Sequence, residues 1–216
     1  MEKKEVISII LAVLLMTISL FLFSKEVHVI DALTFSLIAS IIIIGLSVYS
    51  KKIVAKKIDT KITISIISWQ RFWIAKRDYF RKPIPAGLLF PLLFLLISNG
   101  FIKVLAFLQF QTQALVSKVS KQYGRLRFST VTEWDECLIA FYSFVTIWVL
   151  AMVATILNSY FSFFPFQELA KYCLYYSAWN MIPLSRFDGG KIFFGSRPLY
   201  VSSLVILAIT AIVVFI

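Results

Sequence analysis

Residues 180–190 read NMIPLSRFDGG, a polar, turn-forming stretch between two apolar segments near the C-terminal end of the sequence. Pro183 and the pair Gly189 and Gly190 are residues that interrupt helices, and Asp188 places a carboxylate beside them. An isolated carboxylate at a membrane boundary is costly to keep, so it is by default a functional-site hypothesis. The stretch therefore predicts one half of an active site.

Composition defines the class of protein. Hydrophobic residues make up 60% of the 216 and charged residues only 15%. Several apolar runs reach the ~17–25 residues that a helix needs to cross a bilayer. We expect an all-α polytopic membrane protein with about five or six transmembrane helices. The runs are residues 6–23, 32–49, 137–157, 169–184 and 198–216. The first run precedes no small-residue cleavage pattern and is interpreted as a retained helix.

The net charge of +11 is concentrated in one region, because ten of the 22 basic residues lie between Lys51 and Lys82. In a membrane protein this pattern indicates cytoplasmic loops and attraction to anionic lipid heads. Membrane lipids are therefore expected partners, and nucleic acid is not, since no reading helix or aromatic-basic sheet is evident. The charges predict a prokaryotic cytoplasmic membrane protein with a cytoplasmic N-terminus and with Asp188 near the cytoplasmic face.

The region between residues 62 and 110 does not fit a simple helix count. Segments 62–75 and 88–97 are short for a crossing, and both flanks of the region are basic. Re-entrant or shallow elements, or a β-hairpin insertion, satisfy these constraints. The expected organisation is a two-helix transmembrane hairpin over residues 1–60 and a membrane core over residues 61–216, with a strand-like insert around residues 101–128.

Residues 108–114 alternate glutamines with mostly apolar residues. Period-two alternation is typical of a strand with one polar face. A strand edge can bind an extended peptide through main-chain hydrogen bonds, and Gln109, Gln111 and Gln113 are the candidate residues. The alternative is a cytoplasmic hairpin that binds no guest strand.

The order Asn180-x-x-Pro183 followed by Asp188-Gly189-Gly190 resembles the site-2 protease family of intramembrane zinc metalloproteases. The resemblance implies that Asp188 is the third zinc ligand and that Asn180 and Pro183 help to position a substrate backbone. It also implies a His-Glu-x-x-His helix upstream, whose two histidines bind zinc while the glutamate activates water.

That zinc helix has no intact counterpart in this chain. The one histidine is His28, in the loop after the first apolar run. Aligning Ala75-Lys76 with the small-basic pair that often follows the family's zinc helix puts the motif positions at Ile67, Ser68 and Arg71. Zinc and catalysis are therefore not expected, unless Asp188 recruits an atypical ligand such as Cys173.

Two further hypotheses concern the residues around Asp188. Arg71 at a former ligand position would face Asp188, and an Arg71–Asp188 pair would replace zinc as a clasp between two helices. The alternative leaves Asp188 in solvent near Arg186 or Lys191. Gly189 and Gly190 are expected to provide positive φ in a turn, and Asn180 with Pro183 can equally be a helix-ending device.

Three functions remain open from the sequence. The first is a pseudoprotease that binds a transmembrane client or an extended peptide without cutting it. The second is an active metallopeptidase with unusual ligands, and the third is a small membrane scaffold or assembly subunit. A polar groove beside Gln109–Gln113 would favour the first, bound metal the second, and a closed, dry site the third.

Overall fold

The computed structural model describes residues 3–22, 29–71, 79–98, 104–114, 131–160, 165–184 and 186–215. His28 and most of the expected insert beyond residue 114 lie outside these ranges. Helices dominate the described chain, and two small antiparallel sheets accompany them.

Four described helices are long and apolar enough to cross a membrane. They are α1 (Lys3–Phe21), α2 (Val29–Lys57), α5 (Glu133–Tyr160) and α8 (Arg197–Phe215). The fifth predicted run forms α6 (Phe166–Asn180), whose 15 residues extend about 22 Å, less than the ~30 Å of a bilayer core. A mostly helical fold with long apolar helices is as predicted, but four described helices, rather than five or six, are long enough to span, and α6 ends four residues earlier than the apolar run.

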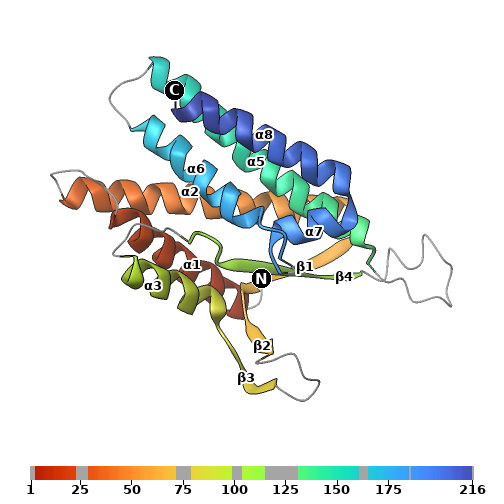
Figure 1. Cartoon of the computed structure of the whole chain (residues 1–216). Helices are drawn as coiled ribbons and strands as arrows, with labels where there is room; N and C mark the ends of the chain where they lie inside the picture. The colour runs from red at the N-terminus through yellow and green to blue at the C-terminus, as the bar shows by residue number, and fades with distance from the viewer. Residues whose placement is uncertain are drawn as a thin grey trace, which may run out of the picture.

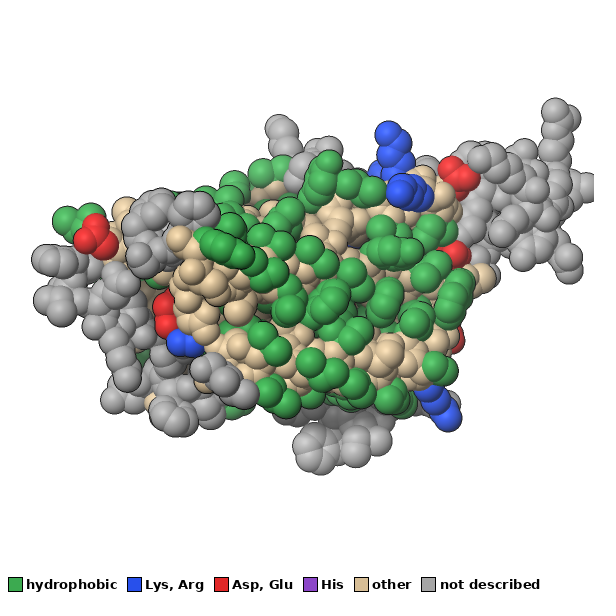
Figure 2. Space-filling model, turned by 90° about the horizontal axis from the view of Figure 1, so that it is seen from above, with side chains coloured by type: hydrophobic (Ala, Val, Ile, Leu, Met, Phe, Trp, Pro, Cys, Tyr) green, Lys and Arg blue, Asp and Glu red, His purple; other side chains and the backbone are tan. Residues whose placement is uncertain are grey.

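The helices form two groups that meet along α2 (Figure 1). α1 packs against α2, and α2 packs against α5, which also contacts α6, α7 (Asp188–Gly195) and α8. Hydrophobic side chains cover the middle of the face drawn in Figure 2, while most of the coloured charges lie toward its two ends. This distribution suits a body surrounded by lipid and exposed to water at both ends.

One two-stranded sheet lies within the helices at the end of the molecule that holds α7 (Figure 1). Strand β4 (Leu108–Ala114) covers the residues predicted from the glutamine alternation, so that prediction is confirmed. Its antiparallel partner is β1 (Thr60–Ile66), with Ile64 opposite Phe110. Both of these apolar side chains are buried.

The zinc-helix alignment fails at the level of secondary structure. Ile67 and Ser68 lie between β1 and β2 (Trp69–Arg71), and β2 pairs with β3 (Tyr79–Ile84). Two histidines four residues apart can bind one metal ion together because both lie on the same face of a helix. The segment here is extended and does not provide that face. Ile67, Ser68 and Arg71 are therefore not the remains of a metal-binding helix.

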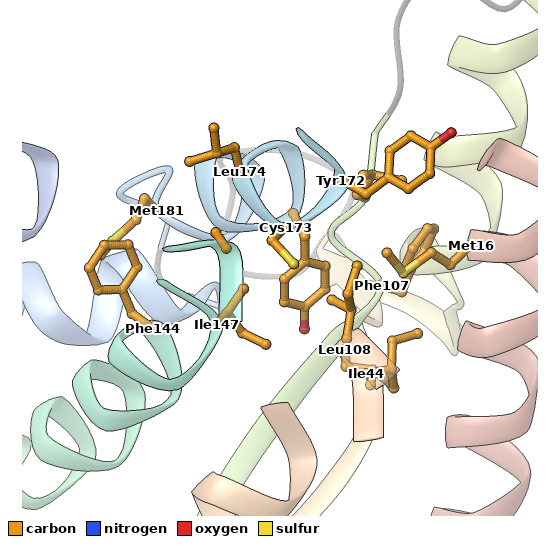
Figure 3. Packing of buried hydrophobic residues seen from close by; sticks show 14 of the residues in the cluster. Met16, Ile44, Phe107, Leu108, Phe144, Ile147, Tyr172, Cys173, Leu174 and Met181 are labelled. Carbon is orange, nitrogen blue, oxygen red and sulfur yellow. The ribbon is translucent and has the colours of Figure 1, made fainter. Parts of the chain in front are cut away.

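The core joins the two expected domains. One cluster of buried apolar residues draws on α1, α2, β1, β4 and the helices from α5 to α8. In Figure 3, Cys173 of α6 lies among Ile147, Phe107 and Leu108, and it is fully buried. The thiol therefore occupies a small apolar position in the packing.

Candidate functional site

A buried ion pair forms the centre of the candidate site. Lys51 Nζ of α2 lies 2.7 Å from Asp188 Oδ2 at the start of α7, and the two side chains are only 4% and 8% exposed. Asp188 is thus neither in solvent nor unpaired. The cation beside this carboxylate is Lys51, whereas the hypothesis named Arg71. The side chain of Arg71 lies outside the described residues.

The chain around residue 188 is shaped by a close approach between two helices. α6 ends at Asn180, and a Cβ on Gly189 would lie 2.3 Å from the Met181 carbonyl oxygen. Only glycine allows this contact, which brings Asp188 under the end of α6. Gly189 and Gly190 lie in the first turn of α7, and Gly189 has no positive φ. The expected reason for Gly189 was therefore wrong, and the correct one is close packing.

The carboxylate also suits its place in α7. Asp188 is the first residue of that helix, where the free N–H groups and the helix dipole favour a negative charge. Asn180, the first residue of the 180–190 stretch, is buried, and its amide donates to the Tyr176 carbonyl at 2.8 Å. α6 does end at Asn180, but this bond goes to a carbonyl within the helix and not to a freed one. Pro183 is exposed just after the helix.

A chain of hydroxyl groups lies beside the ion pair. Tyr176 donates to Ser47 Oγ at 3.1 Å, and Ser47 Oγ lies 3.0 Å from Ser143 Oγ. Ser47 and Lys51 are four residues apart on α2, so they lie on one face of that helix. The polar groups of this hydroxyl chain come from three helices, α2, α5 and α6, and lie near Asp188.

A small cavity lies beside Asp188. It has a volume of about 10 Å³ and is lined by apolar residues and by polar ones that include Ser143, Tyr176, Asn180 and Asp188. Asp188 Oδ1 is buried and has no hydrogen-bond partner in the described part of the chain. The space suits at most one water molecule and is far too small for a peptide.

Phe110 connects this site to strand β4. Its ring lies 5.3 Å from Lys51 Nζ and 3.4 Å from Lys191 Nζ, measured to the ring centroid. Lys191 also donates to the Phe110 carbonyl and lies 3.4 Å from Glu136 Oε2, while Thr112 donates to Glu136 Oε1. Burial lowers the pKa of Lys191, and the Glu136 carboxylate offsets part of that shift.

The candidate glutamines of β4 divide into two environments. Gln109 is buried and its amide donates to Ser65 at 3.3 Å, whereas Gln111 and Gln113 are exposed. β4 pairs with one strand only among the described elements. A strand edge is therefore present, but Lys191 already occupies the Phe110 carbonyl.

The donor set does not fit zinc. One Asp188 oxygen is bound to an ammonium group, and the described residues contain no group of three His, Cys, Asp or Glu side chains that could hold a metal. Catalytic zinc sites use three protein ligands. Cys173 lies in the apolar core and is not among the residues that line the cavity.

Lys51 and Ser47 are the site residues that the sequence reasoning missed. Lys51 was counted with the basic residues that follow the second apolar run, where it looks like one of several flanking charges. The available signal was the i, i+4 spacing of Ser47 and Lys51 at the end of an aliphatic helix. Searches of protein-family models, curated proteins and solved structures gave no match.

Proposed function

We propose that this chain is a catalytically degenerate, site-2-protease-like membrane protein in which an ion pair takes the place of the zinc ion. The Lys51–Asp188 contact carries the proposal. Asp188, before the glycine pair, corresponds to the family's third ligand. The basic residue that holds it, Lys51, comes from α2, an apolar helix far upstream, and the family's histidines also lie on a helix far upstream.

This proposal shifts the motif correspondence to α2. Ser47, Val48 and Lys51 have the spacing of His-Glu-x-x-His, and Ser47 and Lys51 lie on the face turned toward the site. No side chain of the three can act as a general base for a zinc-bound water in the way the family's glutamate does. Lysine keeps the two helices together without a metal, which favours binding or assembly over peptide hydrolysis.

The metal content of the purified protein in detergent tests the first half of this proposal. We expect no stoichiometric zinc in the wild type. Roughly one zinc per chain that is lost in Asp188→Ala would contradict the proposal and favour a metallopeptidase with atypical ligands.

A designed metal site tests the α2 correspondence. Ser47→His with Lys51→His would present two imidazoles one helical turn apart, and Asp188 would complete a three-ligand set. We expect about one bound zinc in this double variant and none after the further change Asp188→Asn. A double variant that folds but binds no zinc would reject the correspondence, whatever the wild type contains.

We infer that the retained fold binds an extended or transmembrane segment of a partner. The exposed Gln111 and Gln113 and the single pairing of β4 support this role. A photo-crosslinking residue at Gln113, compared with one at the exposed Lys57 of α2, tests it in cells. A partner peptide mapped by mass spectrometry at position 113 alone is the expected result.

A scaffold or assembly role is the second candidate function, and one observation favours it. The cavity beside Asp188 has only about 10 Å³ and the ion pair is formed, so among the described residues this cavity offers no room for a peptide at the ion pair. Absence of a position-specific crosslink at Gln113, together with a stable complex in mild detergent, would select this function.

A further inference from the structure

Helix α3 (Ala86–Ile97) is too short to cross a bilayer, yet it is as apolar as a transmembrane helix. Its 12 residues extend about 18 Å, against ~30 Å for the hydrocarbon core. No charged residue lies between Ala86 and Ile97. We propose that α3 and residues 104–107 are the two limbs of a re-entrant element, and that the outer face of α3 contacts lipid acyl chains.

The first support is where the two limbs begin and end. The Gly87 N–H donates to the Ile67 carbonyl at 2.8 Å, and the Ile67 N–H donates to the Phe107 carbonyl at 3.0 Å. A Cβ on Gly87 would lie 2.5 Å from that Phe107 oxygen. The start of α3 and the end of the return limb are therefore joined at one level, beside the end of the β1–β4 sheet. The chain enters and leaves on the same side.

The return limb satisfies the physical condition for non-helical backbone inside a membrane. Residues 104–107 are without regular structure and their side chains are all buried, from 0% to 8% exposed. Irregular backbone is tolerated at membrane depth only where protein covers it. α3 covers part of this limb and packs beside the spanning helix α1 (Figure 1).

The two ends of α3 have the side chains expected for different depths in a membrane. At its start, the half-exposed ring of Trp69 lies 6.3 Å from the Phe90 ring, and tryptophan is enriched at membrane interfaces. At its other end, both the N–H and the hydroxyl of Ser98 donate to the Phe94 carbonyl. A helix end in lipid needs its free carbonyls bound internally, and Ser98 does this for one of them.

Lipid acyl chains are the occupant that the outer face fits. Seven of the 12 residues of α3 are large, apolar and 40% to 81% exposed: Leu89, Phe90, Leu92, Leu93, Phe94, Leu96 and Ile97. The neighbouring α1 exposes the same kind of side chain along its length, including Ile7, Leu14 and Ile18. The apolar surface of α3 thus continues that of a helix with the length and composition of a span.

Spin labels at Leu89→Cys, Leu93→Cys and Ile97→Cys in liposomes test the inference. These positions are one turn apart on the exposed face, and the native Cys137 and Cys173 are fully buried and shielded from the reagent. Accessibility to oxygen and to a nickel chelate gives the depth of each label. We expect depth to increase by about 6 Å per step, with the Ile97 label in the core. Val201, Val205 and Ile209 of α8 provide a reference ladder on a long apolar helix.

Each other result would overturn the inference. Equal, shallow depths would make α3 an interfacial helix. Low oxygen accessibility at all three positions would mean that a protein partner or second copy covers the face. High accessibility to the nickel chelate would place α3 in water. The measurement does not depend on the proposed function, because it reports depth whether or not the ion pair replaces zinc.

Discussion

Lys51 and Asp188 illustrate the energetics of a buried charge pair. Removing both charges from water costs several kcal/mol per ion, and only the short contact and the α7 dipole repay it. Such a pair adds little net stability compared with apolar residues, but breaking it exposes the full desolvation cost of the remaining charge. Its presence therefore indicates a requirement for a defined helix arrangement or for function.

Lys51→Met should destabilise the protein by about 3–5 kcal/mol, because it leaves Asp188 buried and unpaired. Lys51→Met combined with Asp188→Leu should recover most of that loss. Lys57→Met, at an exposed position on the same helix, should change stability by no more than ~0.5 kcal/mol. Unfolding in detergent measures all three. Equal effects of Lys51→Met and Lys57→Met would show that the buried pair is not formed.

Glycines 189 and 45 form a matched pair for a second prediction. A Cβ at Gly189 would lie 2.3 Å from the Met181 carbonyl oxygen, whereas a Cβ at Gly45 meets nothing within 4 Å. Gly189→Ala should therefore cost roughly 1–3 kcal/mol or more. Gly45→Ala in the middle of α2 should instead stabilise by about 0.5–1 kcal/mol. The same unfolding assay compares them, and a neutral Gly189→Ala would refute the close approach.

At the site, the sequence predicted the residues around Asp188 but not the lysine that pairs with it. Asp188, Asn180 and the glycines were accessible because polar residues and glycines in an apolar context are conspicuous. Lys51 was hidden because a lysine at the end of a spanning helix usually interacts with lipid heads. Lys51 differs from Lys52, Lys56 and Lys57 only through the tertiary fold, which places Asp188 beside it.

Among the elements, the long helices and β4 could be predicted from the pattern of apolar residues in the sequence. Strand β1 could not. The segment TKITISI at residues 60–66 alternates as a strand does, but it lies in a long apolar region that also allows a short helix. Its partner β4 is more than 40 residues away in sequence, as Ile66 opposite Leu108 shows. Pairing over that separation is a tertiary effect that local propensity does not report.

The β1–β4 register gives an element-scale prediction. Thr63 lies directly opposite Gln111. Cysteines at these two positions should form a disulfide under mild oxidation, because opposed antiparallel residues have Cα atoms about 4.5–5.5 Å apart. The offset pair Thr63→Cys with Gln113→Cys is a diagonal neighbour at about 7–8 Å and should cross-link poorly. Mass spectrometry after digestion identifies the bridge, and a preference for the offset pair would mean a shifted register.

The contact between α7 and β4 should make the free energy of unfolding change with pH in the alkaline range. Burial lowers the pKa of Lys191, so the unfolded chain holds that proton more tightly than the folded one. Stability should then rise as pH increases through the window below the unfolded value of about 10.4. Lys191→Met removes this contribution, so the stability of wild type relative to the variant should increase with pH. Parallel pH profiles would contradict the shift.

For the whole molecule, the charges of the described residues favour one orientation. The end that holds the α2 terminus and α7 carries Lys52, Lys56, Lys57 and Arg186, while the opposite end of α5 has no basic residue in its last turn. The positive-inside rule therefore predicts that the first end faces the cytoplasm.

Cysteine labelling tests this orientation. Lys57→Cys and Asn158→Cys are both exposed and lie near opposite ends of α2 and α5. A membrane-impermeant maleimide added to intact cells should label position 158 and spare position 57 until the membrane is opened. The reverse pattern would invert the proposed topology, and equal labelling would mean that the two positions are not on opposite sides.

The ion pair has a consequence for how the protein is made. Lys51 lies in α2, and Asp188 is synthesised only after α5 and α6. Until then the lysine has no carboxylate to meet, and its long side chain can remain at the bilayer surface. Residue 188 must therefore be synthesised before Lys51 can move inward and form the ion pair. A chain truncated before α7 would leave Lys51 without its carboxylate partner.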